Sequence, residues 1–114
     1  SADAAPALLL PAAPYTAPEI WATGIPSESG DRYALGALLF EMLTGRVAFG
    51  TGSDTNALAM ARRHATDAVP SAVEWVPAVP RALDGVAQKL LAKRPEHRYP
   101  SYDALIADLQ LVRD

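Results

Sequence analysis

The strongest pattern in the chain is an apolar stretch over residues 31–44, in which Glu41 is the only charged side chain after the first two positions. A helix that is apolar on nearly all sides belongs inside a domain and not on its surface. Gly45 follows directly, and glycine is the residue that most often stands just after a helix. The pattern therefore predicts a buried helix over residues 31–44.

Other segments have weaker helical patterns. They cover residues 18–22, 55–65, about 81–93 and about 102–112. Pro18 suits the first turn of the short first segment. Ser53 or Asp54 can cap the second, Ser101 can cap the last, and both longer C-terminal segments place leucines on one stripe. These patterns predict an all-α domain of about four main helices plus a short one.

The connections between these helices are long and rich in proline or glycine. Residues 1–14 consist mostly of alanine, leucine and proline, so we expect an extended tail there. Residues 23–30 form a predicted loop with two glycines, one proline and two serines. Residues 70–80 form a second predicted loop, whose Trp75 is expected to pack on the core.

Composition narrows the class of protein. The chain has 114 residues, of which 50% are apolar and 20% charged, which is typical of one soluble globular domain. A net charge of −3 argues against nucleic-acid or anionic-membrane partners. The absence of cysteine excludes disulfides and thiolate metal sites, and no apolar run has the length of a membrane span. We expect a cytoplasmic protein.

Three motifs carry a family resemblance. Residues 15–19 read Tyr-Thr-Ala-Pro-Glu, and residues 31–45 begin Asp-Arg-Tyr-Ala-Leu-Gly and end Phe-Glu-Met-Leu-Thr-Gly. Residues 90–101 read Leu-Leu-Ala-Lys-Arg-Pro-Glu-His-Arg-Tyr-Pro-Ser. In this order, they resemble the C-terminal lobe of a bacterial-looking Ser/Thr protein kinase domain of the eukaryotic type. The resemblance implies a partial kinase C-lobe over residues 15–114, after an activation-segment-like tail over residues 1–14.

The resemblance also implies structural roles for single residues. Glu19 is expected to form an ion pair with Arg98, which would tie the activation segment to the connection before the last helix. Asp31 in the family accepts hydrogen bonds from the backbone of the catalytic loop, and it can alternatively cap its own helix. Leu38 and Met42 match positions that support the apolar spine of the kinase core, or that pack as ordinary core residues.

The chain departs from the family pattern at several positions, the first being Pro11-Ala12 where the family usually has Gly-Thr. Ala12 stands where the family usually has a Thr that holds the catalytic loop and the substrate hydroxyl, and an alanine can do neither. Gly30 replaces the usual Ser, and Arg94 replaces the usual Asp. The loss at Ala12 raises the hypothesis that the parent protein is a pseudokinase.

The residues that perform phosphoryl transfer are absent from this sequence. A kinase needs a Gly-rich loop, a phosphate-binding Lys, a catalytic His-Arg-Asp and a Mg²⁺-binding Asp-Phe-Gly, and none of these motifs occurs. ATP and Mg²⁺ are therefore implied only for a complete kinase, and we expect no cofactor, metal or catalytic residue in this chain. His64, beside Arg62 and Arg63, is predicted to lie on a solvated basic face, and a triad of Ser53, His64 and an Asp lacks a nucleophile elbow.

Two functions stay open. The chain is either the C-terminal segment of a Ser/Thr kinase domain, supplying a helical scaffold and a peptide-docking surface at Pro14, Tyr15 and Thr16, or a kinase-derived, non-catalytic interaction module. A third hypothesis, an unrelated small helical enzyme, has no supporting motif in the sequence. In both leading hypotheses the helix over residues 31–44 leaves one side uncovered, which predicts binding to missing kinase segments, to a protein partner or to a second copy.

Overall fold

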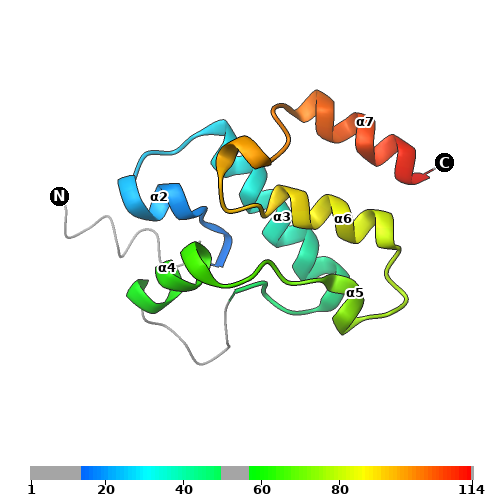
Figure 1. Ribbon diagram of the computed structural model, residues 1–114, viewed down its shortest axis with the longest axis horizontal. Coiled ribbons are helices and arrows are strands. Elements are labelled where there is room, and N and C mark those ends of the chain that lie inside the picture. The colour runs from blue at the N-terminus through cyan, green and yellow to red at the C-terminus, as the bar shows by residue number, and fades with distance from the viewer. Residues whose placement is uncertain (1–13, 50–56, 114) are drawn as a thin grey trace.

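The computed structural model describes residues 14–49 and 57–113, and within these ranges it contains helices and no strand (Figure 1). The six α-helices are α2 (Pro18–Thr23), α3 (Glu28–Thr44), α4 (Ala57–Thr66), α5 (Ala72–Trp75), α6 (Arg81–Leu90) and α7 (Tyr102–Arg113). A single-turn 3₁₀ helix, η2 (Pro95–His97), lies between α6 and α7. The all-α prediction is confirmed, whereas the predicted tail, except for Pro14, lies outside the described residues.

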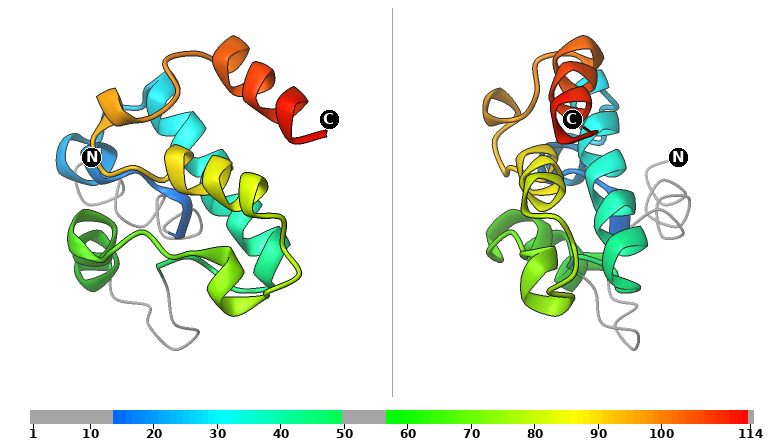
Figure 2. Two further views of the ribbon diagram at one scale, coloured as in Figure 1. Left: turned by 45° about the vertical axis from the view of Figure 1, so that its right-hand side comes forward. Right: turned by 90° about the vertical axis from the view of Figure 1, so that its right-hand side faces the viewer.

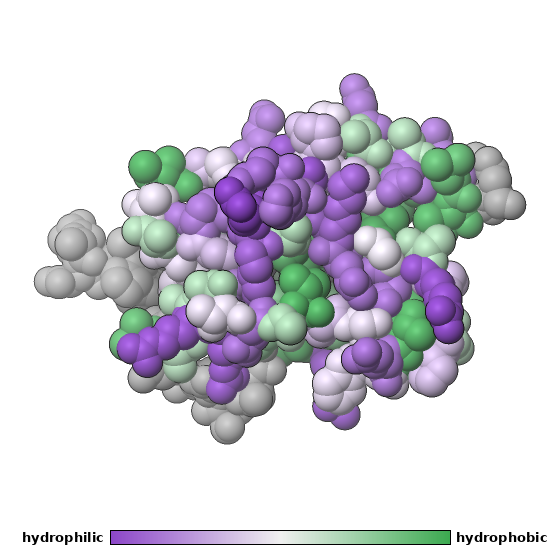
Figure 3. All heavy atoms as spheres, in the orientation of Figure 1, coloured by the Kyte–Doolittle hydropathy of each residue, from purple (hydrophilic) through white to green (hydrophobic). Residues whose placement is uncertain are grey.

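Helix α3 is the axis of the fold, and α6 packs along it (Figures 1 and 2). Gly36 permits the close approach of these two helices, because a Cβ at this position would lie 2.5 Å from the Cβ of Leu90. The larger core cluster gathers around Tyr33 and Phe40 of α3, and a smaller one lies between α6 and α7. Polar side chains cover most of the face shown in Figure 3.

Helix α3 begins earlier than the sequence indicated. Ser27 is its N-cap, and the Ser27 Oγ accepts a hydrogen bond of 2.9 Å from the Gly30 N–H. Asp31 therefore does not cap the helix and lies in its first turn. The end is as predicted, since Gly45 adopts a left-handed conformation, with φ of 76°, and donates its N–H to the Glu41 carbonyl.

Helix α6 ends at Leu90 and not near residue 93. The carbonyl groups of Ala92 and Lys93 face the Arg98 guanidinium, which donates hydrogen bonds of 2.8 and 3.1 Å to them. These carbonyls consequently have a partner outside the helix. The start of α7 is as predicted, because the Ser101 Oγ accepts a hydrogen bond from the Ala104 N–H.

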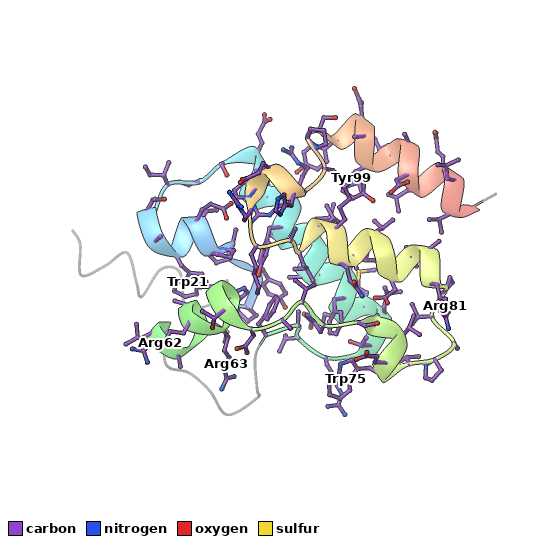
Figure 4. The ribbon with its side chains drawn as sticks, in the orientation of Figure 1. Trp21, Arg62, Arg63, Trp75, Arg81 and Tyr99 are labelled. Atoms are coloured by element: carbon purple, nitrogen blue, oxygen red, sulfur yellow. The ribbon has the colours of Figure 1, made fainter. Side chains whose placement is uncertain are left out.

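The predicted loop over residues 70–80 contains the short helix α5. The start of α5 is held by the buried Asp84 of α6. The Asp84 carboxylate accepts hydrogen bonds of 2.7 Å from both the Ala72 N–H and the Ser71 hydroxyl. Trp75 does not pack on the core as predicted. Its side chain is 52% exposed and its ring lies 4.4 Å from the Arg46 guanidinium (Figure 4).

Helix α4 was predicted over residues 55–65 and is described as Ala57–Thr66, while its proposed caps Ser53 and Asp54 lie outside the described residues. None of the helices in the described ranges has both the length and the apolar character needed to cross a bilayer.

Candidate functional site: an arginine-clamped helical frame with a bare apolar face

Arg98 joins three parts of the molecule through one buried guanidinium. Its Nη1 and Nη2 donate to the two carboxylate oxygens of Glu19 at 2.7 and 2.8 Å, a bidentate geometry that strengthens an ion pair. The Nη1 atom also donates to the Ser29 Oγ at 3.1 Å. The Arg98 side chain has no exposed surface and that of Glu19 is 27% exposed. Helix α2, the first turn of α3 and the connection after α6 are thereby held together.

The ion pair also sets the charge state of Glu19. Burial by itself raises the pKa of this carboxyl, but the hydrogen bonds and positive charge of Arg98 outweigh burial, so the net pKa lies below its ordinary value. The carboxylate therefore stays ionised through the neutral pH range.

Arg32 forms a second clamp that sequence reasoning missed. It is 6% exposed, and its Nε and Nη2 atoms donate to the carbonyls of Tyr99 and Pro100 at 3.0 and 3.4 Å. Its guanidinium lies 5.3 Å from the Tyr102 ring centroid. The signal in the sequence was a charged side chain at the start of an otherwise apolar helix. Arg32 and Arg98 together hold much of the chain between α6 and α7.

The prediction for His64 was wrong. Its side chain has no exposed surface, and its Nδ1 lies 2.7 Å from the Tyr33 hydroxyl. The imidazole also contacts the rings of Phe49 and Trp21, with centroids 5.0 and 6.3 Å away. Arg62, in contrast, is exposed, and Figure 4 shows it projecting away from the body of the molecule. His64 is thus part of the interface through which α4 packs on α2 and α3.

Leu38 and Met42 do not pack as core residues within the described parts of the chain. Leu38 is 45% exposed and Met42 is 73% exposed, and neighbouring Leu35 is 39% exposed. In Figure 2, α4 and α6 both lie on one side of α3, and no other described helix packs along its opposite side. The spine-like positions therefore form an apolar surface.

Helix α7 extends this surface. Tyr102, Ile106 and Leu109 recur at helical spacing and are 44, 49 and 37% exposed. An open hollow of about 630 Å³ joins the two helices. Its lining is almost entirely apolar and consists of Tyr15, Asp31, Ala34, Leu35, Leu38 and Tyr102. We refer to the hollow and the exposed residues of α3 and α7 named here as the α3–α7 face.

Asp31 is the one acidic residue in the lining of this hollow. It is exposed, and within residues 14–49 and 57–113 its carboxylate accepts no hydrogen bond. The structure brings Glu19 and Arg98 into contact, and no ion pair joins Asp31 to either of them in the described ranges. A group that covered the α3–α7 face could therefore donate hydrogen bonds to Asp31.

The residues expected to dock a peptide differ in accessibility. Tyr15 is fixed by donating its hydroxyl hydrogen to the Glu41 Oε1 at 2.5 Å, and this hydrogen bond raises the pKa of the tyrosine. Pro14 and Tyr15 are half-buried, whereas Thr16 is only 8% exposed. The Thr16 side chain is thus the least reachable of the three.

The site offers no evident place for a metal ion in the parts of the chain that are described, where no three His, Asp or Glu side chains gather suitably. The described surface offers apolar packing on the α3–α7 face and contacts at Pro14 and Tyr15.

Comparisons with known proteins point to one family. No family model matches the chain. It is 38% identical over 100 residues to the serine/threonine-protein kinase PrkC of Bacillus subtilis, a match covering 88% of this chain and 15% of that protein. It is 35% identical to the probable serine/threonine-protein kinase PknB of Lactococcus lactis, covering 83% of this chain and 15% of that protein. For the serine/threonine-protein kinase PknL of Mycobacterium tuberculosis, the identity is 32% and the shares are 94% and 26%.

Proposed function

We propose that this chain, which belongs to the bacterial Ser/Thr protein kinases as a C-terminal part of their helical lobe, is the scaffold against which the rest of a kinase domain packs. Nearly the whole chain matches these kinases, yet it spans only about 15 to 26% of the lengths of the three compared above. The phosphoryl-transfer motifs would lie in the remainder of such a protein. ATP and Mg²⁺ would act there, and we place the parent protein in the cytoplasm, where ATP is supplied.

The observation that carries the proposal is the α3–α7 face. A helix as apolar as α3 is expected to be buried on all sides, but Leu38 and Met42 are exposed in this chain. A contiguous exposed apolar surface favours binding to another surface. The hollow beside Asp31 supports an occupant that combines apolar side chains with free backbone N–H donors, which an upstream helix and its adjoining loop would supply.

Peptide docking belongs to the same proposal in a narrower form. Tyr15 is held by Glu41 and half-exposed beside Pro14, so a bound peptide could run across these two residues. The Glu41 carboxylate, which accepts the hydrogen bond from the Tyr15 hydroxyl, would favour a basic side chain on that peptide.

The experiment that tests the scaffold role places Leu38→Asp in the full-length parent protein. A charge at this position would be buried without a partner if kinase segments cover the α3–α7 face, so we expect loss of folded protein and of Mg-ATP-dependent phosphorylation of a general protein substrate. Leu111→Asp is the matched control, because Leu111 is 72% exposed and lies about 200° around α7 from Leu109. A Leu38→Asp parent as stable and active as the control would refute the scaffold role.

The alternative, a non-catalytic interaction module, is favoured by one sequence observation, the alanine at Ala12 where the family usually carries threonine. It predicts that the unaltered parent protein folds but transfers no phosphate from Mg-ATP. Restoring the hydroxyl with Ala12→Thr is the sharper test, since a gain of transfer would identify a kinase weakened at this position.

A further inference from the structure

A second hollow lies between α5 and α6, and it shares no lining residue with the α3–α7 face. It is open to solvent and has a volume of about 460 Å³. Figure 4 shows Arg81, which belongs to this hollow, at the start of α6 and on the side of the molecule where α5 lies. The lining includes Ser71, Glu74, Arg81, Asp84, Gly85 and Gln88. This hollow is therefore much more polar than the one beside Asp31.

Gly85 forms part of the wall, and no contact in the described ranges requires a glycine there. It lies inside α6, where glycine is a poorer helix former than alanine. Gly36 has a packing reason, but nothing described lies within 4 Å of a Cβ placed on Gly85. The glycine leaves bare helix backbone in the hollow, which permits the main chain of a bound segment to approach closely.

The hollow also presents polar groups that the chain itself does not use. Glu74 and Arg81 are exposed, carry opposite charges and form no ion pair in the described ranges. The Gln88 Nε2 donates to Asp84 at 3.3 Å, and its amide oxygen accepts no hydrogen bond in the same ranges. The buried Asp84 carboxylate already accepts hydrogen bonds from the chain at both oxygens. The hollow can therefore offer a ligand one cation, one anion and one hydrogen-bond acceptor.

We propose that this hollow binds an extended segment of a partner protein that carries both an acidic and a basic side chain. The acidic side chain pairs with Arg81 and the basic one with Glu74. A backbone N–H of the segment donates to the Gln88 amide oxygen where the segment crosses Gly85. Small ligands are mostly enclosed by their pockets, whereas an open hollow suits a chain that enters and leaves it. The inference is independent of the proposed kinase role.

The test titrates the isotope-labelled 114-residue chain with blocked peptides and follows its backbone amides by NMR. The probes are acetyl-Ala-Lys-Ala-Glu-Ala-amide and acetyl-Ala-Glu-Ala-Lys-Ala-amide, since side chains two apart lie on one side of an extended chain. At least one order of charges should give saturable shifts at the amides of Glu74, Gly85 and Gln88 at millimolar peptide. The same peptide with Gln at both charged positions should bind about threefold to tenfold more weakly, because two exposed ion pairs are lost.

Variants of the chain locate the binding. Gly85→Leu fills the hollow with a good helix former and should weaken binding at least about tenfold. Ala82→Leu is the matched control, because Ala82 is exposed on the same helix and does not line the hollow, and it should leave binding unchanged. Arg81→Gln, which depends on no packing, should weaken binding about threefold. Circular dichroism checks that all variants fold.

Three results overturn the proposal. The first is the absence of saturable shifts at these amides with both charged peptides. The second is unchanged binding in the Gly85→Leu and Arg81→Gln variants, which would place the peptide elsewhere. The third comes from an arm with free glutamate or free lysine, because binding as tight as that of the peptide would mark a small-ligand site instead.

Discussion

At the scale of single residues, the Glu19–Arg98 ion pair should dominate stability. Glu19→Gln leaves the fully buried Arg98 guanidinium without its counter-charge, and we expect a loss of about 3 kcal/mol in the free energy of unfolding. Urea denaturation followed by circular dichroism measures this loss. The pair of Arg94 and Glu96 is the matched control, since both side chains are more than half exposed at a distance of 2.8 Å.

Glu96→Gln should leave the urea midpoint nearly unchanged, because exposed pairs are screened by water. Equal effects of Glu19→Gln and Glu96→Gln would show that the buried pair contributes nothing special. The comparison separates burial from mere proximity, since both pairs are bonded at similar distances.

Residue contacts were predictable only where a motif fixed them. Glu19 and Arg98 are distant in sequence, and the family resemblance alone suggested their contact. The burial of His64 was not predictable from its neighbours Arg62 and Arg63, because only the packing of α4 against Tyr33 and Trp21 decides which side of α4 faces inward. The prediction that Leu38 and Met42 pack in the core was wrong within the described ranges, because apolar character alone does not say which side of α3 the other described helices cover.

At the scale of elements, the contact between α3 and α6 depends on Gly36. Gly36→Ala would place a Cβ 2.5 Å from the Leu90 Cβ and 3.3 Å from the Leu90 backbone carbon. The two helices would have to separate, and we expect a loss of about 1–3 kcal/mol in unfolding free energy despite the better helix propensity of alanine. Thermal unfolding followed by circular dichroism gives the measurement.

Gly85→Ala is the control for this substitution. Gly85 lies inside α6, and nothing would lie within 4 Å of an added Cβ. Only the higher helix propensity of alanine then matters, so the free energy of unfolding should rise by about 0.5–1 kcal/mol. Opposite signs for the two glycines are the expected result, and a stabilising Gly36→Ala would disprove the close packing.

Helix existence was easier to predict than helix ends. The apolar stretch of α3 and the cap at Ser101 were visible in the sequence, because local chemistry determines them. The early end of α6 and the presence of α5 depend on distant side chains, namely Arg98 and Asp84, which offer hydrogen-bonding partners to backbone groups. Such tertiary partners have no local sequence signal.

At the scale of the whole molecule, the free energy of unfolding should pass through a maximum at alkaline pH, because buried ionisable groups titrate there. The lowered pKa of Lys93 means that the unfolded chain binds more protons between about pH 8 and 10.5, so the free energy of unfolding rises through this interval. Burial raises the pKa values of Tyr33 and Tyr99, so stability falls again above about pH 10. Urea midpoints measured from pH 7 to 11 should pass through a maximum, and Lys93→Met should remove the rise.

At acid pH, the same profile of stability against pH depends on the protonation of Glu19. Its lowered pKa contributes stability that is complete above the ordinary value of 4.5 and is lost as the pH falls through the folded-state value. Glu19→Gln should therefore flatten the acid limb while leaving the alkaline maximum in place. A midpoint that declines steadily from pH 7 to 10 in the unaltered chain would contradict the environment assigned to Lys93.

The α3–α7 face should make the isolated chain associate. Leu38 and Met42 expose apolar surface that water solvates poorly, and pairing two such faces removes it from water. Sedimentation velocity at tens of micromolar should therefore show species larger than a monomer. Replacing both residues by Gln should return the chain to a monomer, whereas Leu111→Gln, on the other side of α7, should not. A monomeric unaltered chain would show that this face is tolerated in water, and it would remove the physical reason for expecting a covering segment or partner.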